Sequence, residues 1–183
     1  MIKELLRKRE IGIVIKQDTS ENQVKSIYLG IGSNLGNRKK NIELAKFNLI
    51  QKNIEIVKSS NFYETLSWPN SLNPKFLNIV IHIKTNLDRI HLLFECKKIE
   101  KILGRKKTAK NSPRTCDIDI LDYDNIQSKK GIILPHPRLH KRNFVLFPLF
   151  EIDKDWHHPV TKNHIKKLIN SLSQRDIITT KQV

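Results

Sequence analysis

Apolar and polar positions alternate along the chain with two different periods, and each period predicts one kind of element. Runs with apolar residues at every second position, or short β-rich runs that break at glycine or serine, predict strands. Stretches in which apolar residues recur every three or four positions predict helices. The expected strands are 26–34, 54–65, 76–85 and 116–124, and the expected helices are 38–53, 88–103, 143–152 and 161–172.

Three residues refine the expected helices. Asn37 can cap the first helix, because its side-chain oxygen can accept a hydrogen bond from a free amide of the first turn. Gly104 follows the second helix, where a left-handed residue commonly ends the element. Pro148 interrupts the apolar segment 143–152, which is therefore either a short core helix or a helix that ends at its proline.

The first six elements follow the order β-α-β-β-α-β, which is typical of a ferredoxin-like fold. The expected fold class is α/β (α+β), an antiparallel sheet with helices packed against one side of it. At 183 residues the chain has room for one ordinary domain, while a second core would be cramped. We expect an N-terminal extension over residues 1–23, a single domain over 24–172 and a C-terminal tail over 173–183 that ends disordered.

The two cysteines and the N-terminal segment indicate in which cellular compartment the protein is expected. Cys96 and Cys116 are far apart and lack metal-ligand spacing, which favours reduced thiols in a cytoplasmic protein. Each is expected to be a small core residue. The N-terminal segment holds an apolar run of only five residues, Ile11 to Ile15, so it predicts neither a signal peptide nor a membrane span.

The chain is strongly basic, with 34 Lys and Arg against 18 Asp and Glu and a formal net charge of +16. Such a field attracts anions, whether nucleic acid, acidic membrane or a small phosphorylated ligand, and charge alone does not choose among them. No zinc-finger spacing, aromatic-rich RNA-binding strand or long basic helix with heptads accompanies the charge. A basic RNA- or ribosome-associated module on the same fold is the alternative function.

Two acids stand one residue apart inside the apolar run CDIDIL. Side chains at i and i+2 share one face of a strand, so Asp117 and Asp119 point the same way, roughly 6.5 to 7 Å apart. Carboxylates this close repel each other unless water separates them or a cation sits between them. Mg²⁺ takes such oxygens and completes its shell with water and substrate phosphates. An edge strand with a solvated acidic face is the structural alternative.

Basic residues approach this acid pair from both sides. Arg114 lies three residues before the first acid, and others come from the preceding helix and loop. A nucleoside triphosphate needs such cations, because a metal neutralises part of its charge and Arg or Lys binds the rest. The basic run by itself could also be a solvated face. It consists of Lys97, Lys98, Lys101, Arg105, Lys106, Lys107 and Lys110.

The glycine-rich stretch GIGSNLG invites comparison with nucleotide-binding loops. Its spacing is GxGxxxG rather than GxGxxG, and the chain contains no GxxxxGK[ST]. A strand end followed by a helix cap is the better interpretation.

Six motifs, in this order, resemble the hydroxymethyldihydropterin pyrophosphokinases of folate biosynthesis: GSNLGNR, FYET, FLN, IEKILGR, PRTCDIDIL and LPHPRLHKRNFVLFPLFEI. The resemblance covers residues 27–152, and its last two motifs together are highly specific. It implies a ferredoxin-like fold and transfer of the terminal diphosphate of ATP, as one unit, to the hydroxymethyl group of the pterin, with release of AMP. Spacing alone does not exclude a kinase that releases ADP.

The same resemblance implies a cofactor and a set of charged site residues. Asp117 and Asp119 match ligands of two Mg²⁺ ions, and Arg105 and Arg114 match loop arginines that close on the ATP phosphates, which makes these four the expected catalytic residues. We expect a cytoplasmic monomer that acts on small molecules and not on nucleic acid or membranes. The expected nucleotide contacts are Glu100, Arg105, Arg114, His136 and Arg142.

For the pterin, the resemblance implies an aromatic sandwich and a polar edge. Phe76 and Phe144 match the stacking rings, and Thr65 and Asn78 match the groups that hydrogen-bond the edge.

The chain departs from the family in one loop, where some members carry Trp and this chain has Asn111. Trp68, in the other long loop, is a candidate substitute. Both loops, 66–75 and 104–113, are expected to act as lids that exclude water.

Overall fold

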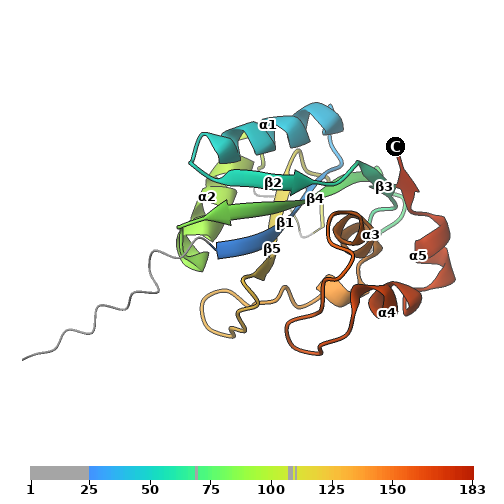
Figure 1. Cartoon of the computed structure of the whole chain (residues 1–183). Helices are drawn as coiled ribbons and strands as arrows, with labels where there is room; N and C mark the ends of the chain where they lie inside the picture. Colours follow the sequence, from blue (N-terminus) through green and yellow to red (C-terminus); the bar gives the residue numbers. More distant parts are fainter. Residues whose placement is uncertain (1–24, 69, 107–108, 110) are drawn as a thin grey trace, which may run out of the picture.

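A six-stranded antiparallel sheet organises the computed structural model, which describes residues 25–68, 70–106, 109 and 111–183 (Figure 1). The strand order is β5-β1-β4-β3-β6, and β2 pairs with β4 beside β3. The expected extension over 1–23, and two residues of the basic run, Lys107 and Lys110, lie outside the described residues. The strands are β1 (Lys25–Ser33), β2 (Glu55–Ser59), β3 (Tyr63–Thr65), β4 (Phe76–Thr85), β5 (Asp117–Tyr123) and β6 (Lys181–Gln182).

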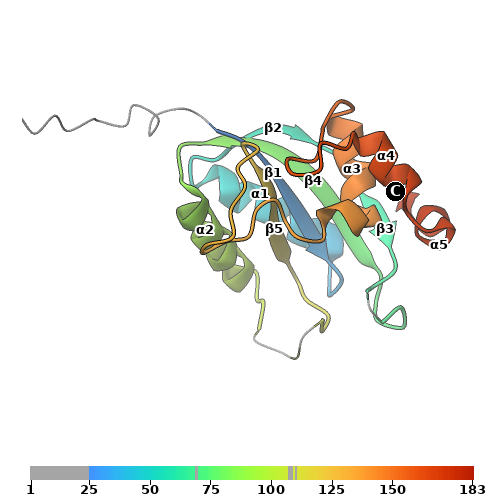
Figure 2. The ribbon, with the colours of Figure 1, turned by 90° about the horizontal axis from the view of Figure 1, so that it is seen from below.

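Helices cover both faces of this sheet (Figures 1 and 2). One apolar core lies between the sheet and α1 and α2, and a second lies between its other face and α3 and α4. The element order and the antiparallel pairing of the predicted ferredoxin-like fold are confirmed, but the expectation of helices on one side is wrong. The helices are α1 (Arg38–Ile50), α2 (Arg89–Ile102), α3 (Asn143–Ile152), α4 (Ile165–Asn170) and α5 (Gln174–Ile178), with a 3₁₀ turn at Leu139–Lys141.

The central strand β4 explains why both faces are covered. Ile79, Ile81 and Ile83 belong to the first core, while Val80 points to the other face and belongs to the second. A strand that is apolar on both faces has to be buried on both faces. No helix in the described part of the chain is long and apolar enough to cross a membrane.

The predicted helix caps are confirmed. The Asn37 side chain accepts a hydrogen bond from the Lys40 amide at 3.0 Å, and Gly104 follows α2 with a φ of +82°. A further cap begins α2, where Asp88 Oδ1 accepts from the amides of Ile90 and His91 at 2.8 and 3.0 Å. These hydrogen bonds, together with the His91 side chain, lower the pKa of Asp88 to about 2.

Asp88→Ala should lower the free energy of unfolding by about 1 kcal/mol, because it leaves the first amides of α2 without their acceptor. Asp88→Asn keeps an oxygen in the same place and should cost less. Urea unfolding followed by circular dichroism would measure both. An unchanged midpoint for the alanine variant would contradict the cap.

Two expected elements differ in the structure for reasons of hydrogen bonding and packing. The single strand expected over 54–65 is divided into β2 and β3. Between them the Ser60 hydroxyl accepts the hydrogen bond of the Val80 amide at 3.0 Å, which a backbone carbonyl would accept in a continuous strand. The helix α3 continues through Pro148 to Ile152, so only the short core helix of the two alternatives is confirmed. Its buried side chains hold it in the second core.

The C-terminal region is more ordered than its sequence predicts. The helix expected over 161–172 is present only as α4. The chain then forms α5 and β6 instead of the disordered end that we expected, and β6 pairs with β3. Asn143 Nδ2 also donates to the Asp176 carbonyl at 3.1 Å and to Thr180 Oγ1 at 2.9 Å. These partners lie far away in the sequence, which is why local patterns do not reveal them.

Candidate functional site

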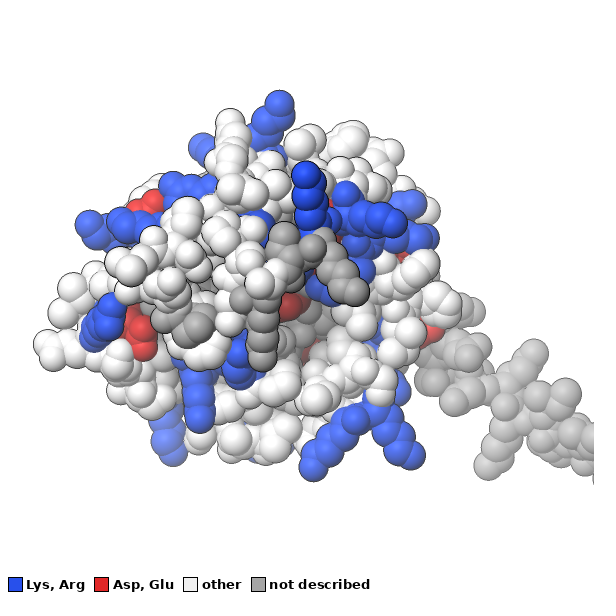
Figure 3. Space-filling view, turned by 180° about the vertical axis from the view of Figure 1, so that it is seen from behind, with Lys and Arg blue, Asp and Glu red and all other residues white. Residues whose placement is uncertain are grey.

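A cavity of about 490 Å³ opens on the face of the sheet that carries α3. Strands β1, β4 and β5 supply its floor, and its rim comes from α3, the segment around residues 136–142, and described residues of the loops 66–75 and 104–114. Seen from behind, Lys and Arg side chains spread over the surface of the protein (Figure 3). Nine residues predicted from the sequence line the cavity: Phe76, Asn78, Arg105, Arg114, Asp117, Asp119, His136, Arg142 and Phe144.

Two glycines of β1 lie in the floor of the cavity, and at Gly32 the cavity depends on the missing side chain. Gly30 stands opposite Asp119 and Gly32 opposite Asp117 in the pairing of β1 with β5. A Cβ atom on Gly32 would lie 2.8 Å from Asn78 Oδ1, so a side chain there would force Asn78 to shift. The sequence motif did not indicate this role for Gly32, although glycines two apart inside a strand share a face and often mark a close approach.

Each acid of the pair has its own arginine partners. Asp117 Oδ1 lies 2.6 Å from Arg105 Nη1, and Asp117 Oδ2 lies 2.6 Å from Arg114 Nη2. Asp119 Oδ2 lies 3.1 Å from Arg142 Nη1. Burial raises the pKa of Asp117, but the positive charges of Arg114 and Arg105 outweigh burial and hold the pKa below its ordinary value. Asp117 is therefore ionised at neutral pH.

His136 lies beside Asp119, with 3.8 Å between its Nε2 and Asp119 Oδ2. Burial lowers the pKa of His136, and the arginines 138 and 142 lower it further against the opposing pull of Asp119. The imidazole is therefore neutral at neutral pH. Its Nδ1 accepts a hydrogen bond from the Arg138 amide at 3.2 Å. Its Nε2 therefore faces Asp119 of β5 and Arg142 of the rim, whose Nη1 lies 3.4 Å away.

Two aromatic rings of the cavity each carry an arginine on one face. The Arg114 guanidinium lies 5.2 Å from the centre of the Phe76 ring, and that of Arg142 lies 5.2 Å from the centre of the Phe144 ring. Guanidinium groups within about 6 Å of a ring are attracted by its electron-rich face. The cavity thus joins flat apolar surface to a cluster of positive charge.

Two predicted site residues lie behind the cavity wall. Thr65 is buried and accepts a hydrogen bond from Asn78 Nδ2 at 3.1 Å, so it orients a residue that does line the cavity. The Glu100 side chain is 3% exposed and is likewise absent from the lining. In this structure both residues act on the cavity through the side chains that they contact, Asn78 and Arg105.

The loop aromatic and several basic residues complete the rim. Trp68 lines the cavity with 63% of its surface exposed, and the Arg138 guanidinium lies 5.3 Å from its ring centre. Asn111 also lines the cavity. Arg138 was not among the predicted site residues, although it stands in the same basic motif as His136.

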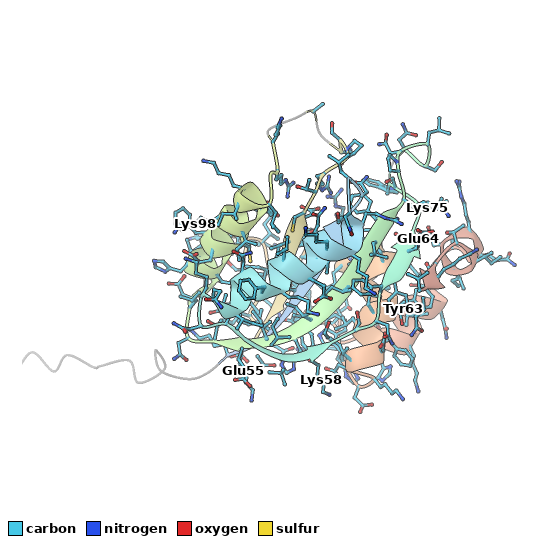
Figure 4. The ribbon with its side chains drawn as sticks, turned by 90° about the horizontal axis from the view of Figure 1, so that it is seen from above. Glu55, Lys58, Tyr63, Glu64, Lys75 and Lys98 are labelled. Carbon is cyan, nitrogen blue, oxygen red and sulfur yellow. The ribbon has the colours of Figure 1, made fainter. Side chains whose placement is uncertain are left out.

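The loop that carries Trp68 is anchored at its far end. Lys75 Nζ lies 3.0 Å from Glu64 Oε1, and Arg38 Nη2 lies 3.0 Å from Glu64 Oε2. Figure 4 shows Lys75 beside Glu64 on β3. The Lys75–Glu64 pair ties the end of the loop to β3, and Arg38 Nη1 donates to the Lys75 carbonyl at 2.9 Å, whereas Trp68 itself remains largely in solvent.

The cysteines take no part in the cavity. Cys96 and Cys116 are free and buried, which confirms them as core residues. Burial raises the pKa of each thiol to about 12, so both are protonated and unreactive at neutral pH.

The oxygen donors fit a magnesium ion that arrives with a phosphorylated ligand. Asp117 and Asp119 line the cavity from one face of β5. Mg²⁺ is usually held by one or two carboxylates, with water and substrate phosphates completing its shell. Among the described residues no group of three His, Cys, Asp or Glu could form an all-protein metal site.

Comparison with known sequences identifies relatives over most of the chain. The family model for 7,8-dihydro-6-hydroxymethylpterin-pyrophosphokinase (HPPK) matches residues 28–154. A 2-amino-4-hydroxy-6-hydroxymethyldihydropteridine pyrophosphokinase from Aquifex aeolicus is 41% identical over 143 residues, which cover 78% of this chain and 89% of that protein. The folic acid synthesis protein fol1 of Pneumocystis carinii is 38% identical over 177 residues, which cover 95% of this chain but only 24% of that protein.

Comparison with solved structures supports the fold. The HPPK-DHPS protein of Plasmodium falciparum (variant A437G, with STZ-DHP) superposes with a TM-score of 0.66 at 16% identity. The match covers 83% of this chain and 46% of the longer one. At this level of identity the likeness concerns the fold alone.

Proposed function

Because the chain belongs to the 7,8-dihydro-6-hydroxymethylpterin-pyrophosphokinase family, we propose that it transfers diphosphate from ATP to the hydroxymethyl group of 6-hydroxymethyl-7,8-dihydropterin, releasing AMP, in folate biosynthesis. One observation carries the proposal. A single cavity holds Asp117 and Asp119, the arginines bonded to them, and the rings of Phe76 and Phe144. A flat apolar ligand and a polyphosphate can therefore meet there.

The pterin would bind at the apolar side of the cavity. Phe76 and Phe144 supply ring faces for stacking, and an offset-stacked ring contributes about 0.5 to 1.5 kcal/mol beyond its burial. Asn78, oriented by Thr65, would hydrogen-bond the polar edge of the bicycle. Selectivity would come from that edge, because a buried polar group left unpaired is costly.

The triphosphate would bind at the charged side. Arg105, Arg114 and Arg142 supply planar guanidinium groups that bind phosphate oxygens in pairs. His136, neutral and with Nδ1 already bonded, can donate from Nε2 to a phosphate oxygen. Transfer of this kind needs little covalent work from side chains, so positioning and charge stabilisation carry it, and no general base is assigned.

The acids Asp117 and Asp119 would hold magnesium, and two ions are expected. When bound, the ions would neutralise phosphate charge and polarise the bridging oxygens. The arginines now paired with these acids would then bind the phosphates.

Two loops would enclose the reactants. Trp68 would cover the pterin in place of the aromatic missing at Asn111, because it already lines the cavity from an anchored loop. Water would be excluded once both loops, 66–75 and 104–113, have closed.

The catalytic unit would be the single domain over residues 24–172, acting as a cytoplasmic monomer on small molecules. The alternative RNA-binding module has no support in the comparisons, since the relatives described above are named as enzymes or proteins of folate synthesis.

Gly32→Ala should weaken pterin binding at least about tenfold while the protein stays folded. The new Cβ would lie 2.8 Å from Asn78 Oδ1 and 3.4 Å from the Phe76 ring, so both groups would have to leave their places in the cavity. Pterin fluorescence titration measures the affinity. Gly30→Ala is the matched control, because its Cβ would meet Leu121 at an ordinary 3.4 Å. Equal effects of the two substitutions would contradict the role of Gly32.

Product analysis tests the proposed function directly. Purified protein is incubated with Mg²⁺ and ATP, with and without 6-hydroxymethyl-7,8-dihydropterin, and nucleotides are separated by chromatography. AMP that forms only with pterin is the expected product. ADP would indicate transfer of a single phosphoryl group at the same site, and absence of any product would refute the proposal.

A further inference from the structure

The peptide between the two acids of β5 is held by a helix and not by another strand. Ile118 stands opposite Ile31 of β1, and β1 is the only described strand beside β5. The Ile118 amide donates to Glu100 Oε1 of α2 at 2.7 Å, so it points away from β1 toward the open edge of the sheet. Lys97 Nζ, one turn earlier on α2, lies 3.4 Å from the Ile118 carbonyl oxygen.

Side chains of α2 therefore take the place of a neighbouring strand at this one residue. An amide and a carbonyl at a sheet edge need partners once they are covered. Glu100 and Lys97 are three residues apart and share one face of the helix, so together they supply an acceptor and a donor. They are also bonded to each other, with 2.7 Å between Lys97 Nζ and Glu100 Oε1.

The same carboxylate also holds one of the cavity arginines. Glu100 Oε1 lies 2.7 Å from Arg105 Nη1, and that nitrogen lies 2.6 Å from Asp117 Oδ1. Arg105 thus has one partner on the cavity floor and one behind the wall. If a ligand binds Asp117 and breaks its ion pair with Arg105, the ion pair with Glu100 still holds Arg105 at the rim.

Glu100 is an unusual choice for a purely structural position. Its side chain is 3% exposed, and a buried carboxylate costs more to fold than an apolar residue of similar size. Here the negative charge is stabilised by an amide, a lysine and an arginine. The amide belongs to β5, and the lysine and the arginine each also contact residue 117 or 118 of that strand.

We propose that Glu100 is a positioning residue for the phosphate side of the cavity: it fixes the Ile118 peptide, and with it Asp117 and Asp119, and it retains Arg105 at the rim. The inference deepens the proposed function and rests on it for the identity of the ligand. Because Glu100 does not reach the cavity, its effect on the nucleotide is indirect.

Hydrogen exchange of the Ile118 amide tests the first part of this role without any substrate. In Glu100→Ala the amide should exchange about 10- to 150-fold faster than in the wild type, as expected when a hydrogen bond to a charged acceptor is lost. Glu100→Gln keeps an acceptor oxygen and should retain most of the protection. The Asp119 amide, which faces β1, should not change. Equal protection of Ile118 in the wild type and in Glu100→Ala would overturn the proposal.

Ligand binding tests the second part. Both Glu100 variants should bind the magnesium complex of an unreactive ATP analogue about 10- to 100-fold more weakly, the usual effect of losing a group that orients metal ligands. Pterin affinity should stay unchanged, because Phe76, Asn78 and Phe144 stand on β4 and α3. A merely structural role would weaken both ligands together, and that result would overturn the proposal.

Glu95→Gln is the matched control on the same helix. Glu95 pairs with Lys98 at 2.9 Å and with Lys52 at 3.7 Å, and neither partner belongs to β5. This variant should bind both ligands like the wild type. If Glu100→Ala fails to fold, Glu100→Gln decides, and wild-type nucleotide affinity in that variant would overturn the proposal. Failure of the proposed function would appear separately, as wild-type protein that forms no pterin-dependent AMP.

Discussion

Asp117→Asn should abolish pterin-dependent AMP formation and leave the fold intact. The substitution conserves shape but removes a full charge, since the pKa of Asp117 is held below its ordinary value and the group is ionised at neutral pH. It also removes an oxygen donor for magnesium and the anchor of Arg105 and Arg114. A loss of about 4 kcal/mol of transition-state stabilisation, within what a metal ion supplies, corresponds to about a thousandfold in rate.

Asp119→Asn should have a comparable effect, because this acid points into the same cavity and holds Arg142. Chromatography of AMP at saturating Mg²⁺ gives the rate for each variant, and thermal unfolding reports on the fold. Asp124→Asn is the control: Asp124 follows the same strand with a φ of 51°, a conformation that Asn tolerates. Magnesium-dependent activity retained in both cavity variants would refute the metal assignment.

Arg114→Ala should lower the rate or the ATP affinity about 10- to 150-fold, the effect of losing a hydrogen bond to a charged group worth about 1.5 to 3 kcal/mol. The side chain reaches Asp117 at 2.6 Å and lies over the Phe76 ring. The loop should keep its place, because the Arg114 amide, which remains in the variant, donates to Asn34 Oδ1 at 2.7 Å.

Two further variants separate the loss of the guanidinium group from the loss of positive charge. Arg114→Lys keeps the charge but not the planar fork, so it should recover only part of the activity. Arg175→Ala removes an exposed arginine of α5 and should have no effect. An unchanged rate constant together with unchanged ATP affinity in Arg114→Ala would place Arg114 outside the site.

Local patterns predicted the central part of the site well. Period-two alternation put Asp117 and Asp119 on one face of a strand, and both line the cavity. The short separation of Arg114 from the acids made their contact foreseeable. By contrast, Arg142 is 23 residues from Asp119, and from the residues alone it was only one more basic residue near an apolar segment. The family resemblance identified it, and the structure places it against Asp119.

Patterns of the same kind could not reveal contacts that depend on packing. The role of Gly32 comes from a pairing that brings it beside Asn78, and its lack of a side chain matters only there. Glu100 was expected near the nucleotide, but its carboxylate binds the Ile118 amide, 18 residues away. The C-terminal strand β6 forms because β3 offers it an edge, which no pattern within residues 173–183 indicates.

The sequence by itself determined most elements up to α3, their order and the presence of a paired-acid strand, because backbone geometry imposes periods of 3.6 and 2 on any helix or strand that buries one face. Only the tertiary structure decided that helices cover both faces of the sheet, that Arg105 and Arg142 pair with the acids, and that a buried carboxylate holds the peptide between the acids. These features arise from sheet register and helix packing, which bring together residues that are distant in the chain, so local periodicity carries no record of them.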